Sequence, residues 1–273
     1  MYHCRVESLH TDTPVYQRLD GGKDHYFFAE ARVAKDYVST GLYEKSIIQW
    51  SIENFVKPDK VFVDIGAHMG MYSLSISPHA KHVYAFECSP KSFNYLCANI
   101  ALQDQHYNVD KFNVALSNQE GVARYYVRDP RDGGANGISK FALDETNNTP
   151  YVEVPTRTLD SYKLKNVGFI KIDVEGHEKQ VLEGALETLQ TNGYPPFLFE
   201  SWLPSSDNTI PKTDLRKELF AYIKFVGGPK SFWRYTMAVL DQRTFKVLLA
   251  AARRTISNWQ CRFEMFKGLT KSN

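Results

Sequence analysis

The sequence lacks paired cysteines and long hydrophobic runs. Its 273 residues include four cysteines, without a CxxC pair or a metal-ligand spacing. In a chain of this size we interpret them as free thiols in a reducing compartment. No apolar stretch approaches the roughly 20 residues that span a bilayer, and the N-terminus has no basic head followed by an apolar run, as a secretory signal would. We therefore expect a soluble, cytoplasmic protein without a transmembrane segment.

Net charge is small, at +2, but it is unevenly distributed. Residues 216–273 hold 12 Lys/Arg and 3 Asp/Glu, so the preceding part of the chain is mildly acidic. An apolar stripe with helical spacing runs through the same region, at Phe245, Leu249, Ala252, Ile256, Trp259, Phe263 and Phe266. We expect a basic C-terminal segment, 231–273, with an amphipathic helix that packs on its own domain, contacts an anionic partner or membrane surface, or forms a dimer.

Internal repeats and low-complexity linkers are also absent. From about residue 47, apolar β-rich runs alternate with amphipathic stretches, which is typical of a parallel sheet with crossover helices. The expected strands are Val61–Ile65, His82–Glu87, Phe112–Leu116, Phe169–Asp173 and Pro196–Ser201. The expected helices are Met71–Ser77, one that Ser89 caps, and Glu178–Thr188. Gly121–Val127 and Tyr151–Thr158 indicate two additional strands, joined by a long loop that either borders the active site or is purely structural.

The first expected strand runs into a glycine turn with the pattern D-x-G-x-x-x-G. Asp64 stands just before the turn, Gly66 permits a tight bend where a Cβ would collide with a ligand, and Gly70 opens the next helix. Glu87 ends the second strand, where its carboxylate can accept both ribose hydroxyls of a nucleotide lying across the strand ends. These features together predict a nucleotide-type cofactor site.

Two cofactors compete for this geometry. A dinucleotide site prefers G-x-G-x-x-G, and here His68 replaces the second glycine of that motif. Asp64 would repel a phosphate, but it suits the positively charged sulfonium and amino group of S-adenosylmethionine. The sequence therefore favours S-adenosylmethionine, a methyl donor.

Five segments resemble the FkbM family of methyltransferases in their order and spacing. They are VFVDIGAHMGMYSL, VYAFECSP, NVALSNQEG, TRTLDSY and FIKIDVEGHEKQVLEGA. The upstream run Gly41-Leu-Tyr-Glu44 is also similar to that family's lead-in to its first strand. The resemblance spans roughly residues 37–202, and the pairing of DVEGHE with the GAHMG turn is its most specific part.

The resemblance implies an α/β, class I methyltransferase (Rossmann-like) fold, with a seven-stranded, mostly parallel sheet flanked by helices and an antiparallel last strand. It also implies O-methylation of a sugar, polyketide or similar small-molecule hydroxyl. Carried onto this chain, the cofactor contacts would be Gly66 to Gly70 with the backbone at His68 for the methionine part, Glu87 for the ribose, Val114 and Ala115 for the adenine, and Glu44 for the amino acid end. We expect residues 1–46 to be an extension or lid over this site and residues 47–230 to be the methyltransferase domain.

Methyl transfer to an alcohol needs a base, or a metal that lowers the pKa of the hydroxyl. Asp173 ends the fourth expected strand, and Lys171 shares its face by strand alternation. Glu175 joins them if the extended conformation continues, and His177 follows within one turn of chain. We predict that Asp173, Glu175 and His177 are catalytic. There is a structural alternative for each residue. Asp173 could cap the following helix, Glu175 could satisfy backbone amides near its N-terminus, and His177 could be exposed on it.

A divalent metal is a further possibility. Glu200 ends the fifth expected strand, next to Asp173 in the expected sheet order. Two hard oxygen ligands from adjacent strand ends suit magnesium or manganese. Asp173 and Glu200 are therefore a candidate metal pair, although paired carboxylates in a cleft also serve as acid and base alone.

The expected function is O-methylation of a hydroxyl on a sugar, glycan or similar small natural product. DVEG stands where methyltransferases of DNA amino groups carry an Asn/Asp-Pro-Pro-aromatic signature, so we expect no DNA partner. RNA ribose 2′-O-methylation remains open, because Lys171, Asp173 and the basic tail could serve it, although RNA-type aromatic-basic interleaving is missing. A non-enzymatic cofactor-binding module is the third alternative.

Overall fold

The computed structural model describes residues 15–20, 23–28, 44–102, 108–129, 136–138, 148–200 and 237–240. The chain forms two compact units, Met1–Phe197 and Leu198–Asn273. The first unit contains the glycine turn and the segment around Asp173, so the candidate site is built within it.

A parallel sheet lies at the centre of the first unit. Its strands are, in order across the sheet, β9 (Val167–Ile172), β3 (Val61–Ile65), β4 (His82–Phe86) and β5 (Val109–Phe112). All of β3 is buried, as expected for a central strand that is covered on both faces. The predicted α/β fold with a mostly parallel sheet is confirmed.

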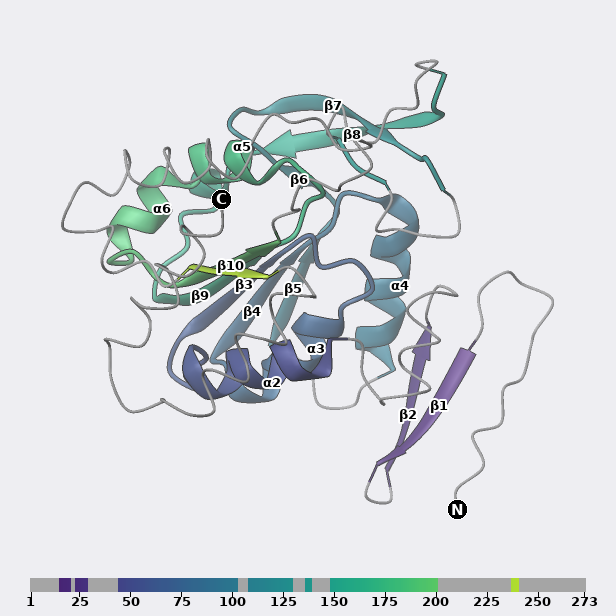
Figure 1. Ribbon diagram of the computed structural model, residues 1–273, viewed down its shortest axis with the longest axis vertical. Coiled ribbons are helices and arrows are strands. Elements are labelled where there is room, and N and C mark those ends of the chain that lie inside the picture. Colours follow the sequence, from purple (N-terminus) through teal and green to yellow (C-terminus); the bar gives the residue numbers. More distant parts are fainter. Residues whose placement is uncertain are drawn as a thin grey trace, which may run out of the picture. The chain divides into compact units, whose positions relative to one another are not determined.

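Helices flank this sheet on both sides (Figure 1). One side carries α2 (Lys45–Asn54), α3 (Met71–Ile76) with the 3-10 turn η1 (Ser77–His79), and α4 (Pro90–Ala101). The other side carries α5 (Glu178–Glu183) and α6 (Leu186–Thr191). The predicted cap of α4 is confirmed, since Ser89 Oγ accepts a hydrogen bond from the Ser92 amide at 3.3 Å and Pro90 occupies the first turn.

The strand predicted at Phe112–Leu116 is wrong as a single element. The main sheet ends at β5, and β6 (Ala115–Leu116) pairs instead with β8 (Tyr151–Arg157), which pairs antiparallel with β7 (Gly121–Tyr126). The chain leaves the main sheet at Asn113, whose Nδ2 donates a hydrogen bond to the carbonyl of Glu87 at 2.9 Å. The two additional strands predicted at 121–127 and 151–158 are confirmed, and they form a second, three-stranded sheet.

The single helix predicted at Glu178–Thr188 is divided into α5 and α6. A Cβ on Gly184, between them, would lie 1.9 Å from the carbonyl oxygen of Ser117, so the chain passes very close to β6 there. Asp160, in the 3-10 turn η4 (Leu159–Tyr162), accepts hydrogen bonds from the amides of Glu187 at 3.0 Å and Thr188 at 2.7 Å. These contacts begin a new helix, and they come from residues far away in the sequence.

The ends of the chain are described only in short pieces. Strand β10 (Phe197–Glu200) starts at the last residue of the first unit and continues into the second. It is a hydrogen-bonded neighbour of β11 (Met237–Leu240). In the predicted lid, β1 (Val15–Asp20) and β2 (Lys23–Phe28) form an antiparallel hairpin. The rest of the lid, the seventh strand and most of the basic segment 231–273 lie outside the described residues and stay predictions. Across the described residues, no helix is both long and apolar enough to span a bilayer.

Candidate active site

The glycine turn follows β3, as predicted, and both of its glycines have positive φ. Gly66 has a φ of +74°, and a Cβ there would lie 1.7 Å from the carbonyl oxygen of Asp173. We expected a ligand to be the obstacle at this position, but the obstacle is the backbone after β9. Gly70, with a φ of +92°, is the N-cap of α3, which confirms that it opens this helix.

Glu87 lies directly after β4 and is tied to the turn. Its Oε2 accepts a hydrogen bond from the His68 amide at 2.8 Å, and its Oε1 accepts one from the Ser89 amide at 2.7 Å. Burial raises the pKa of Glu87. A carboxylate offers about four lone-pair sites, so acceptor capacity remains for ribose hydroxyls. Ribose binding by Glu87 stays a prediction, as does the contact of His68 with the methionine part.

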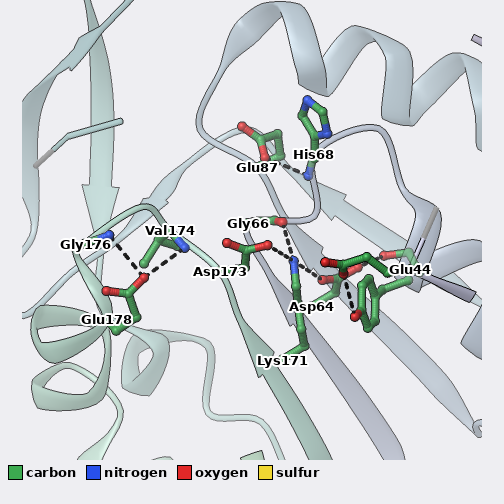
Figure 2. A network of polar contacts seen from close by, with 12 residues as sticks. Glu44, Asp64, Gly66, His68, Glu87, Lys171, Asp173, Val174, Gly176 and Glu178 are labelled. Carbon is green, nitrogen blue, oxygen red and sulfur yellow. Dashed lines mark hydrogen bonds and ion pairs between the residues drawn. The ribbon is translucent and has the colours of Figure 1, made fainter. Parts of the chain in front are cut away.

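A buried lysine joins the turn to the end of β9 (Figure 2). Lys171 Nζ donates a hydrogen bond to the Gly66 carbonyl at 2.9 Å and lies 3.1 Å from Asp173 Oδ2 and 3.9 Å from Asp64 Oδ1. Burial alone would lower the pKa of Lys171, but the carboxylates of Asp173, Asp64 and then Glu44 outweigh it and raise that pKa. Lys171 is therefore an ammonium at any physiological pH.

Asp64 is fully buried. Its Oδ2 accepts a hydrogen bond from Ser73 Oγ at 2.6 Å, while its Oδ1 has no hydrogen-bond partner and faces Lys171. Burial raises the pKa of Asp64. The residue is 0% exposed, and a role of Asp64 in cofactor binding stays a prediction.

Glu44 belongs to the same cluster although it lies far upstream in the sequence. It is the N-cap of α2, with a left-handed φ of 51°, and its Oε2 accepts a hydrogen bond from the Tyr72 hydroxyl at 2.8 Å. Burial, and then the charge of Asp173, raise the pKa of Glu44. The carboxylates of Glu44, Asp64 and Asp173 thus act on one ammonium, so the ionised cluster carries excess negative charge.

The end of β9 and the segment after it hold the three residues that we predicted to be catalytic. Lys171 and Asp173 do share a face, and the Asp173 side chain is the exposed member at 32%. The extended conformation ends at Ile172, and Glu175 has a φ of 52°, so the condition under which Glu175 would join that face is not met. His177 is the N-cap of α5, where its Nε2 contacts Ser117 Oγ at 3.0 Å and burial lowers its pKa. Catalytic roles for these residues stay predictions.

The sequence analysis did not single out Glu178, which contacts the turn after Asp173. Its Oε1 accepts hydrogen bonds from the amides of Val174 at 3.3 Å and Gly176 at 3.2 Å. We had considered Glu175 for the role of satisfying amides in this turn. The available signal was an acidic residue in the first turn of a helix that follows a glycine, since such residues interact with free amide groups. Burial raises the pKa of Glu178 to about 7.

Replacing Glu178 with glutamine should flatten the pH dependence of stability between about pH 4.5 and 7. The folded pKa of Glu178 is about 7, above its ordinary 4.5. In this window the folded state binds more protons than the unfolded state, so the free energy of unfolding falls as pH rises. Across this window, the wild type loses on the order of 1–3 kcal/mol of unfolding free energy through Glu178, and Glu178→Gln should remove this loss. Urea unfolding at several pH values measures it. Glu187→Gln, at an exposed position of α6, should keep the wild-type slope; the same slope in Glu178→Gln would contradict the prediction.

The remaining predicted site residues are placed less completely. Val114 and Ala115 are buried where the chain passes from β5 to β6, and their contact with adenine stays a prediction. Glu200 ends β10, but its side chain lies outside the described residues. Within the described ranges, no group of three or more His, Cys, Asp or Glu side chains could hold a metal ion. The proposed metal pair of Asp173 and Glu200 also stays a prediction.

Comparison with known proteins identifies the domain. Residues 64–196, from the end of β3 to the start of β10, match the family model described as the methyltransferase FkbM domain. This stretch, a little under half of the chain, is similar to FkbM methyltransferase domains. This confirms the family resemblance found in the sequence, and the FkbM domain includes the glycine turn, Glu87 and the whole segment from Lys171 to Glu178.

One curated relative of the FkbM domain is the hexuronic acid methyltransferase AglP of Haloferax volcanii. It is 27% identical over 148 residues, which are 54% of this chain and 59% of the relative, so the chain spans little more than half of that protein. A solved FkbM methyltransferase of Methylobacillus flagellatus overlaps 61% of this chain and 38% of its own, at 16% identity and a TM-score of 0.40. A precorrin 8W decarboxylase of Methanobacterium thermoautotrophicum overlaps 67% of this chain and 70% of its own, at 14% identity and a TM-score of 0.39.

Proposed function

We propose that the chain is an S-adenosylmethionine-dependent O-methyltransferase that acts on a hydroxyl of a sugar or glycan. The FkbM domain supports methyl transfer, and the relative named for hexuronic acid supports a sugar acceptor. The observation that carries the proposal is the pair of a partly exposed Asp173 carboxylate and a buried Lys171. Lys171 also donates a hydrogen bond to the glycine turn. The free thiols of Cys88 and Cys97 support a reducing compartment, which we propose to be the cytoplasm.

The residues present suit S-adenosylmethionine by charge. The three carboxylates of the cluster share one ammonium, and Asp64 Oδ1 is buried without a hydrogen-bond partner. Such excess negative charge favours a ligand that carries a sulfonium and an ammonium, and it disfavours a pyrophosphate. We assign the turn from Gly66 to Gly70 and the carboxylate of Glu87 to holding it. When bound, S-adenosylmethionine supplies a methyl group on a positively charged sulfur.

We assign the activation of the acceptor hydroxyl to Asp173. Its carboxylate is the more exposed partner in the pair with Lys171, so it can accept the proton of an alcohol, or hold a metal that lowers the pKa of that alcohol. The buried Lys171 Nζ also donates a hydrogen bond to the Gly66 carbonyl at 2.9 Å. Lys171 thereby fixes the orientation of the Asp173 carboxylate relative to the glycine turn. Fixed geometry of this kind contributes much of the rate in a displacement reaction.

A transfer assay tests the proposal. The full chain is incubated with S-adenosylmethionine labelled in its methyl group and with separate acceptors: free hexuronic acids, acidic glycans, neutral glycans, small alcohols and RNA. Each reaction is run with and without a chelator. We expect label in the sugar acceptors, as base-stable methyl ethers rather than as base-labile esters. Heat-inactivated protein is the control.

Each outcome of this assay decides one part of the proposal. Label in RNA alone would mean that the acceptor is a ribose 2′-hydroxyl of RNA and not a sugar or glycan. Base-labile label would mean that the product is a carboxyl methyl ester and not an O-methyl ether. Donor binding without transfer to any acceptor would favour a cofactor-binding module. Activity that resists the chelator removes the metal pair and leaves Asp173 as the base.

A further inference from the structure

Glu178 is a buried carboxylate whose hydrogen-bond partners are backbone amides. Only 8% of the residue is exposed. Its Oε1 accepts from Val174 and Gly176, and in the described part of the chain no cation pairs with it. A buried carboxylate without a cation is costly unless it forms good hydrogen bonds. The Glu178 carboxylate therefore depends on backbone amides: its own and those of Val174 and Gly176.

The turn that Glu178 contacts has an unfavourable backbone conformation. Glu175 has a φ of 52° and Gly176 a φ of 93°, so two successive residues lie in the left-handed region. For a residue other than glycine this costs about 1–2 kcal/mol. The turn thus needs support from outside, and Glu178 supplies it by binding the amides on both sides of Glu175.

This turn follows Asp173 directly. The Asp173 amide donates to the Ile65 carbonyl at 2.9 Å, which fixes the backbone on the β9 side. Its carboxylate lies 3.1 Å from Lys171 Nζ. On the other side, the first fixed point is the Val174 amide, which Glu178 binds (Figure 2). Asp173 is therefore held between a strand end and a turn whose conformation depends on Glu178.

We propose that Glu178 is a positioning residue for methyl transfer: by binding the amides of Val174 and Gly176, it keeps the Asp173 carboxylate in its place beside Lys171. The inference rests on the proposed function, because it assigns Asp173 to the acceptor. Glu178 itself touches neither donor nor acceptor, and it acts through the backbone.

Three variants of the full chain test this role. Glu178→Ala removes the acceptor oxygen, Glu178→Gln keeps an oxygen in the same place, and Glu187→Ala removes an exposed carboxylate from the next helix. Amide hydrogen exchange of residues 173–177 is measured, together with kcat, KM for the acceptor and the calorimetric affinity for S-adenosylmethionine. If Glu178→Ala does not fold, Glu178→Met takes its place, since it fills similar space without an oxygen.

In Glu178→Ala we expect faster exchange in 173–177 with unchanged exchange in β3 and β4. We also expect kcat to fall by about tenfold or more, with KM and donor affinity within about threefold of wild type. Glu178→Gln should restore both exchange and kcat, and Glu187→Ala should change neither. Unchanged exchange in 173–177 overturns the inference, as does a loss of kcat that glutamine does not restore. If the wild type methylates no acceptor, the proposed function fails, while the exchange data still decide whether Glu178 holds the turn.

Discussion

Asp173→Asn should reduce kcat by about 10²- to 10⁴-fold. An amide cannot take the proton of the acceptor, and the substitution also removes the charge that lies 3.1 Å from Lys171 Nζ. Of the two carboxylates that form ion pairs with this lysine, that of Asp64 is fully buried and that of Asp173 is 32% exposed, so Asp173 is the one of this pair that offers an oxygen to an acceptor. Initial rates with labelled S-adenosylmethionine measure the effect. The donor should still bind within about tenfold of wild type, because Glu44 and Asp64 keep their charges.

A matched control comes from an exposed strand residue. Asp110, on β5, pairs with His82 at 3.1 Å and lies outside the Lys171 cluster. Asp110→Asn should leave kcat within about twofold of wild type, as surface substitutions commonly do. Wild-type turnover by Asp173→Asn would show that Asp173 is neither the base nor a metal ligand, and the search for the acceptor site would move to His177 and Glu175.

Gly66→Ala should destabilise the protein by about 3–5 kcal/mol, or prevent folding altogether. The new Cβ would lie 1.7 Å from the Asp173 carbonyl oxygen, which is backbone and cannot swing aside. It would also force a left-handed φ of 74° on an alanine. Moving β9 away from β3 would relieve the clash only by breaking the parallel pairing that holds the site together. Urea unfolding, followed by circular dichroism, measures the change.

Gly193 separates the two parts of this effect. Its φ of 70° is nearly that of Gly66, but no atom lies within 4 Å of an added Cβ. Gly193→Ala should therefore cost only the backbone strain, about 1–2 kcal/mol. Equal losses of stability in the two variants would mean that the contact with Asp173 is unimportant and that φ alone requires glycine at position 66.

Local patterns were enough to predict the strand, the glycine turn and the place of Glu87. The buried run Val61–Ile65, the following glycines and the acid after the next strand are all written in consecutive residues, and each was found where expected. The cap of α4 at Ser89 was predictable for the same reason. Strand alternation also predicted correctly that Lys171 and Asp173 share a face. These features depend on neighbours within a few positions.

The errors concern contacts between distant parts of the chain. Gly184 can end a helix, but the residues near it do not show that the carbonyl of Ser117, directly after β6, lies so close to it. The strand at 112–116 divides because Asn113 binds the end of β4. In each case a tertiary contact overrides a local preference that was itself read correctly.

The bond from Lys171 to the Gly66 carbonyl joins positions 105 residues apart. Closing so long a loop loses chain entropy before any contact compensates for it, and this slows folding. During synthesis, β3 and its glycine turn leave the ribosome long before β9 does. Until β9 arrives, the Asp64 carboxylate has no ammonium beside it and is better left in water. We therefore expect refolding to be limited by the docking of β9 onto β3, and late intermediates to lack donor affinity even where β3 and β4 are already protected from hydrogen exchange.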